Sequence, residues 1–170
     1  MPRKFVDCVY DVESELALPR GQHIFGRGDI WPDMQRVYEG YLRQAQPYPE
    51  RLRDWRAAYA IIAYHAGRYD VARAQLEALD WKPRQSTLLE WNLDPTVWPL
   101  EVAARGGPLG GKISEAETLY QNGDRAAAYK QYLALSSNAG ADERTKEFIQ
   151  SRLATLNPSQ YQPVPMPSRN

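Results

Sequence analysis

The residues of this 170-residue chain that could do chemistry begin with its two histidines, His23 and His65. They do not have the i, i+4 spacing of a helical metal site, so a metal ion would need carboxylates from distant segments. His65 falls near the predicted C-terminus of a helix, where an imidazolium would interact favourably with the helix dipole. A catalytic triad is a spatial arrangement, but the sequence contains no G-x-S-x-G elbow. We therefore expect no catalytic residue, no cofactor and no metal.

The N-terminal segment carries two further patterns. Asp11, Glu13 and Glu15 alternate along the chain and could serve a cation or general acid–base catalysis. A solvated strand face or loop explains this acidic set more simply. Arg27-Gly28-Asp29 (27–29) matches an integrin-binding tripeptide, but a turn at its glycine and a helix cap at its aspartate are the simpler interpretation.

The segment GGPLGGKI, residues 106–113, matches the phosphate-binding pattern G-x-x-x-x-G-K. That loop needs a hydroxyl group directly after its lysine to hold magnesium, whereas Ile113 stands there and Ser114 comes one place late. The loop should also follow a buried strand, and the preceding residues have a helical pattern. We therefore interpret 106–111 as a flexible hinge rather than a nucleotide site.

Composition excludes several classes of function. Lys plus Arg and Asp plus Glu both number 21, so the chain has no basic excess for nucleic acid. Cys8 is the only cysteine, which rules out an intramolecular disulfide and fits a reducing compartment. No stretch approaches the ~18 consecutive apolar residues of a membrane helix, and no apolar signal-peptide core is present. We expect a soluble, cytoplasmic protein without nucleic-acid or membrane partners.

Apolar residues at helical spacing, with proline and glycine between the runs, predict an all-α chain. The expected helices are 32–46, 50–66, 69–79, 94–106, 112–122, 124–138 and 142–156. The expected regions are an irregular N-terminal arm or short strand in 1–30, a helical segment in 31–80, a Trp/Pro/Gly-rich connector with one short helix in 81–111, a second helical segment in 112–156, and a disordered tail in 157–170.

Two segments match each other, AYHAGRYDVARAQLEAL (63–79) and LYQNGDRAAAYKQYLAL (119–135). Gly67 aligns with Gly123, and Tyr64 aligns with Tyr120. Each segment reads as a helix end, a tight glycine turn and a second helix. Because the turn is short, we expect the two helices of each pair to be antiparallel.

These two segments resemble the tetratricopeptide repeat. In that family a glycine lies in the turn, an aromatic follows two residues later and small residues allow the helices to approach. The matching residues are Gly67, Tyr69, Ala72, Ala60 and Leu76 in the first copy, and Gly123, Ala128, Ala116 and Tyr132 in the second. Arg125 departs from the aromatic position, and the two glycines are further apart than the ~34-residue tandem period. The resemblance therefore implies a divergent superhelix of antiparallel hairpins with extra structure between the copies.

The resemblance implies a concave face that binds a protein or peptide partner. Carried over position by position, this face comprises Asp54, Ala57, Ile61, Tyr64, His65, Ile113, Glu117, Tyr120 and Gln121. The expected function is that of an adaptor, scaffold or assembly subunit rather than an enzyme, and self-association stays open. One alternative is a small hydrolase or ligand-binding domain with a site near His23 and Asp29. The other is a helical accessory domain of a longer enzyme.

Overall fold

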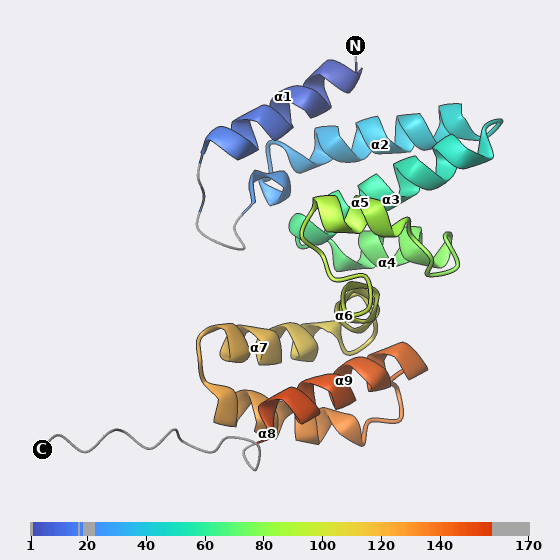
Figure 1. The fold of residues 1–170 in the computed structure, drawn as a ribbon. Helices are drawn as coiled ribbons and strands as arrows, with labels where there is room; N and C mark the ends of the chain where they lie inside the picture. Colours follow the sequence, from blue (N-terminus) through green and yellow to red (C-terminus); the bar gives the residue numbers. More distant parts are fainter. Residues whose placement is uncertain (1, 17, 19–22, 158–170) are drawn as a thin grey trace, which may run out of the picture.

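The computed structural model describes residues 2–16, 18 and 23–157, which fold into helices joined by turns and short loops (Figure 1). These residues form nine α-helices, one 3-10 helix and no strand, which confirms the all-α class. The elements are α1 (Pro2–Glu15), η1 (Ile24–Gly26), α2 (Trp31–Ala45), α3 (Pro49–His65), α4 (Tyr69–Glu77), α5 (Gln85–Glu90), α6 (Trp98–Arg105), α7 (Gly110–Gln121), α8 (Arg125–Ser136) and α9 (Glu143–Leu156). None of these helices is long and apolar enough to cross a bilayer. The tail predicted to be disordered lies outside the described residues from residue 158 onward.

The prediction of an irregular arm in residues 1–30 is wrong, because helix α1 occupies much of that segment. Val6 and Val9 are buried, and Tyr10 and Glu13 follow them on the same helical face. This face packs against α2 and η1. The short apolar run of this segment fits either a strand or a helix, and burial of one helical face decides between them.

The helices stack along the molecule in chain order (Figure 1). Each helix from α1 to α4 packs on the next, α4 packs on α6, and α6, α7 and α8 follow one another. Helix α9 turns back and packs on both α8 and α6. The short helix α5 lies to one side, against α3.

The two predicted glycine turns are present and have the same geometry. Gly67 and Gly123 have φ values of 71° and 84°, in the left-handed region that glycine adopts without strain. In each turn the N–H after the glycine bonds to the carbonyl five residues earlier, the defining bond of a Schellman helix end. These bonds join Arg68 N to Ala63 O at 2.8 Å and Asp124 N to Leu119 O at 2.9 Å.

The small residues predicted after each turn are buried as expected. Ala72 on α4 and Ala128 on α8 have no exposed surface, and neither do Leu76 and Tyr132 one turn later. A methyl side chain at the helix contact lets the backbones of α3 and α4, and of α7 and α8, approach closely. Both antiparallel hairpins therefore form through the same local sequence pattern.

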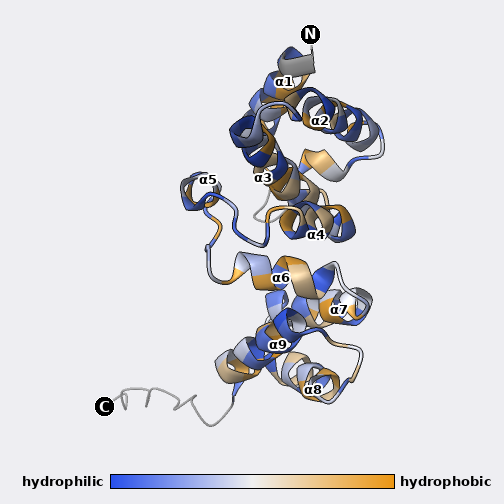
Figure 2. Cartoon of the chain, turned by 90° about the vertical axis from the view of Figure 1, so that its right-hand side faces the viewer, coloured by the Kyte–Doolittle hydropathy of each residue, from blue (hydrophilic) through white to orange (hydrophobic). Residues whose placement is uncertain are grey.

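Helix α6 joins two hydrophobic cores. Trp98 and Val102 belong to the core built from α1 to α5, whereas Ala104 belongs to the core of α7 to α9. The apolar residues of α6 lie between the two groups of helices (Figure 2). A segment expected to be a connector is therefore a central layer of the fold.

The connector differs from its prediction in three ways. It contains α5 as well as α6, and α6 begins at Trp98 after a turn in which Asp94 accepts the Thr96 N–H at 2.7 Å. The GGPLGG segment is tightly packed rather than a flexible hinge, because a Cβ at Gly106 would lie 2.3 Å from the Tyr69 carbonyl oxygen. Glycine is needed there so that α4 can approach the end of α6. The phosphate-loop pattern follows a helix, as expected, and not a strand.

Candidate functional site

The residues predicted for a concave face do not gather on one open surface. Ile61 has no exposed surface and belongs to the core, as Ala57 and Ile113 also do. Glu117 is only 2% exposed. The prediction that Ile61 contacts a partner is therefore wrong, and Glu117 faces the protein interior.

Tyr64 and Glu117 belong to a buried polar network between the two halves of the stack. The Tyr64 hydroxyl on α3 donates to Glu101 Oε1 on α6 at 3.1 Å. Arg105 Nη1 donates to the same oxygen at 2.8 Å. Arg152 on α9 makes two bonds to the Glu117 carboxylate on α7, at 2.7 and 2.9 Å. Arg152 Nη2 also lies 3.9 Å from Glu101 Oε2, so one network links helices from both cores.

The tyrosines of this network stay protonated and act as donors. Burial, followed by the charge of Glu101, raises the pKa of Tyr64 above its usual value. Burial and the hydrogen bond to Glu117 do the same for the pKa of Tyr132, whose hydroxyl donates to Glu117. Both carboxylates are thus held by guanidinium and phenol donors, as buried charges require. The arrangement is suited to fixing the two halves of the stack together.

The remaining predicted residues of the second copy lie at the edge of this network. Tyr120 is half-buried, with the Arg152 and Arg125 guanidinium carbons 5.4 and 5.8 Å from its ring centre. Gln121 is exposed at the end of α7. Tyr120 is therefore engaged by cations of this chain, whereas Gln121 is accessible to a partner.

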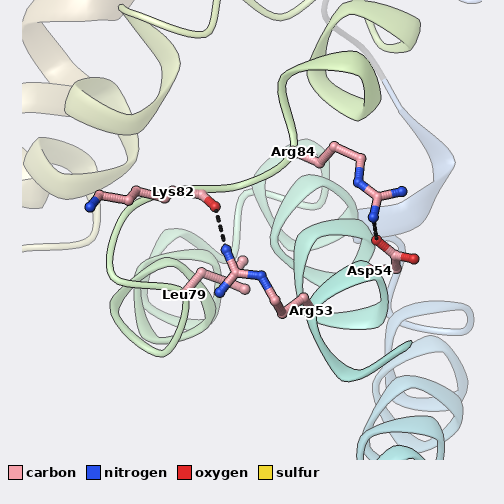
Figure 3. A pocket seen from close by; sticks show the side chains of 5 residues that line it. All are labelled: Arg53, Asp54, Leu79, Lys82 and Arg84. Carbon is pink, nitrogen blue, oxygen red and sulfur yellow. Dashed lines mark hydrogen bonds and ion pairs between the residues drawn. The ribbon is translucent and has the colours of Figure 1, made fainter. Parts of the chain in front are cut away.

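Asp54 lines a shallow basic pocket of about 230 Å³ (Figure 3). Arg84 approaches the Asp54 carboxylate at 3.4 Å, and Arg53 Nη2 donates to the Lys82 carbonyl oxygen at 3.1 Å. Leu79 completes the lining, while the ammonium end of Lys82 points away from the two arginines (Figure 3). These side chains are exposed apart from Leu79, and exposed ion pairs of this kind contribute little free energy. The pocket has no assembled constellation for chemistry.

His65 lies in an aromatic cluster that joins α1, η1, α3 and the loop after α5. Its ring centre is 4.1 Å from that of His23 and 5.4 Å from that of Trp91. Burial, followed by the nearby His23, lowers the pKa of His65 to about 3. The imidazole is therefore neutral at physiological pH, so the predicted interaction of a charged His65 with the helix dipole is wrong.

His23 is paired with a carboxylate, although not with the predicted Asp29. Its Nδ1 lies 2.6 Å from Glu13 Oε1, and Glu13 Oε2 accepts the Ile24 N–H at 2.8 Å. Asp29 is exposed and binds Arg27 instead, at 2.8 Å. Ser14 follows Glu13 in sequence but donates to the Asp11 carbonyl oxygen. Within the described ranges, no cluster of three or more His, Cys, Asp or Glu side chains could hold a metal ion.

A groove over α3, between α2 and α4, was not predicted from the sequence. It has a volume of about 310 Å³, near the lower end of the ~300–1,000 Å³ range of ligand sites. Its walls come from α2 and α4, and its floor is Tyr59 of α3. The lining residues are Gln35, Glu39, Leu42, Tyr59, Asp70, Val71, Ala74 and Gln75. Their i, i+4, i+7 spacing on α2 is visible in the sequence, but their pairing with α4 depends on the tertiary packing.

Comparisons of this chain with protein-family models, curated proteins and solved structures find no match.

Proposed function

We propose that this chain is a protein-interaction module that binds a segment of another protein in the groove over α3. The observation that carries this proposal is the lining of the groove, which combines apolar side chains with polar and acidic side chains along its walls. Binding sites commonly combine these two kinds of surface. The function is thus an adaptor, scaffold or assembly subunit, as the sequence resemblance implied, with the contact surface moved from the first-helix face to this groove.

The rigidity of the groove supports this role. Tyr59 is 2% exposed, and the neighbouring core residues Ala60, Ile62 and Ala72 have no exposed surface. The core therefore holds the backbone of the groove in place before binding. The entropy cost of binding then comes mainly from ordering the partner segment, because the backbone of the groove is already in place.

The hairpins α3–α4 and α7–α8 are, in this proposal, divergent tetratricopeptide-like units. The shared Schellman ends and the buried alanines at equivalent places support that assignment. The helices α5 and α6 lie between the hairpins and separate them from a regular tandem array. The exposed thiol of Cys8 supports a cytoplasmic location.

Site-specific photo-crosslinking tests the proposal in cells of the source organism. A photoreactive phenylalanine analogue replaces Ala74, an exposed residue in the groove, or Ala134, an exposed residue on α8. We expect a protein adduct from position 74 that is absent from position 134. No adduct at 74, or the same adducts at both positions, would contradict the proposal.

The His23–Glu13 pair favours a second candidate, a small hydrolase or ligand-binding site beside α1. A carboxylate that orients an imidazole is part of many general-base sites. Hydrolysis of p-nitrophenyl acetate by the wild-type chain and by His23→Ala measures this candidate. A rate above the buffer background that His23→Ala removes would support a hydrolase, and equal rates would argue against hydrolysis of this ester at His23.

A further inference from the structure

We propose that the occupant of the α2–α4 groove is a cationic segment of a partner protein, in which an aliphatic side chain is flanked by lysine or arginine. This inference rests on the proposed function and specifies its partner. It depends on three features of the groove: the sign of its charges, where those charges converge, and the apolar surface between them.

The groove carries acidic charges on opposite walls. Glu39 lies on α2 and Asp70 on α4, and both are exposed. Within the described part of the chain, neither carboxylate forms an ion pair, and Glu39 accepts only the uncharged Gln35 amide at 2.9 Å. Among the residues that the structure describes, no lysine, arginine or histidine lines the groove. Outside the lining, Arg56 donates to the lining residue Gln75 at 2.8 Å.

Both carboxylates act on the same point of the floor. Burial, followed by the charges of Glu39 and then Asp70, raises the pKa of Tyr59 to about 12. Glu39 of α2, Tyr59 of α3 and Asp70 of α4 line the same groove, so one acid lies on each wall beside this floor residue. A cation placed above this tyrosine would be attracted by two negative charges, whereas an anionic segment would be repelled by both.

The surface between the acids is aliphatic. Leu42 projects from α2, and Val71 and Ala74 project from α4. Leu42 and Val71 are only partly buried and Ala74 is exposed, so this surface is open to a partner side chain. Covering it removes apolar area from water, which supplies affinity, while the flanking acids select the charge of the partner.

Peptide binding by the full chain tests this inference. The probe is a fluorescein-labelled 14-residue peptide of leucine and lysine, and its counterpart carries glutamate at every lysine. Fluorescence anisotropy gives Kd for the wild type, for Glu39→Gln/Asp70→Asn, and for the control Glu90→Gln/Glu147→Gln, which removes two exposed charges elsewhere. We expect the lysine peptide to bind about tenfold more weakly to the groove variant only. Equal loss in the two variants, or binding of the glutamate peptide, would overturn the inference.

A steric pair of variants separates failure of this inference from failure of the proposed function. Ala74→Trp fills the groove, and Ala134→Trp places the same side chain on α8. If an uncharged leucine–serine peptide binds as tightly as the lysine peptide and Ala74→Trp alone blocks both, the groove binds partners but does not select cations. If Ala74→Trp blocks neither peptide, the proposed function itself is wrong. A wild-type dimer in sedimentation that Ala74→Trp dissociates would assign the groove to a second copy and overturn the partner inference.

Discussion

Acidification should destabilise the chain through His65. Its pKa in the folded state is about 3 because of burial and the neighbouring His23, whereas an unfolded histidine has a pKa of about 6.5. The unfolded state therefore binds more protons between these two values. The stabilisation is complete above pH ~6.5 and is lost progressively as the pH falls towards ~3.

The size of this effect at pH 5 follows from the same values. Protonation of unfolded His65 at pH 5, about 1.5 units below its ordinary pKa, lowers the free energy of unfolding by about 2 kcal/mol. The folded imidazole remains neutral at pH 5, so it offers no compensating gain. A folded pKa anywhere below ~4 gives nearly the same loss, which makes pH 5 a suitable test condition.

Urea unfolding at pH 7 and pH 5, followed by tryptophan fluorescence and circular dichroism, measures this loss. His65→Phe keeps an aromatic ring against His23, Tyr64 and Trp91 but cannot bind a proton. We expect the wild type to lose about 2 kcal/mol more than His65→Phe between the two pH values, with equal m-values. Equal losses in both proteins would refute the assignment of this pH dependence to His65.

Three further predictions concern the joints of the fold, and urea unfolding measures each. Gly67→Ala and Gly123→Ala should each lower the free energy of unfolding by about 1 kcal/mol, because both glycines have a positive φ. Asp80→Gly, at φ 53°, should be neutral or stabilising for the same reason. An alanine variant more stable than the wild type would contradict this. Gly106→Ala should cost about 1–3 kcal/mol because its Cβ would meet the Tyr69 carbonyl, and a loss below that of Gly67→Ala would argue against tight packing. Arg152→Met should lower the free energy of unfolding by about 3–5 kcal/mol, because it leaves Glu117 buried without its cation. The double variant Glu117→Leu/Arg152→Met should recover much of this loss. Equal stability of Arg152→Met and the wild type would contradict a structural role for the pair.

The sequence predicts the parts of this fold that local chemistry determines. Gly67 and Gly123 each end a helix, because only glycine adopts the required φ at no cost. Ala72 and Ala128 are predicted as close helix contacts by the resemblance to the tetratricopeptide repeat, which places small residues there. Apolar residues at helical spacing predict the all-α class, and the two glycine turns predict the hairpins.

Tertiary contacts determine the rest, and the sequence pattern does not contain them. Tyr64 could be placed on α3, but its hydroxyl binds Glu101, 37 residues away. Helix α6 resembled a connector because its short apolar run has prolines and glycines on both sides. The sequence does not predict the groove either, because Glu39 and Asp70 come to line one groove only when α2 and α4 lie on either side of α3.

Chemical-shift mapping with the leucine–lysine peptide tests the central claim, partner binding in the groove over α3, most directly. Amide spectra of the labelled full chain are recorded during titration with the peptide and, separately, with its glutamate counterpart. The account predicts saturable shifts concentrated in 35–42, around Tyr59 and in 70–75, caused by the lysine peptide alone. Shifts concentrated in α7 to α9, or equal shifts with both peptides, would contradict it.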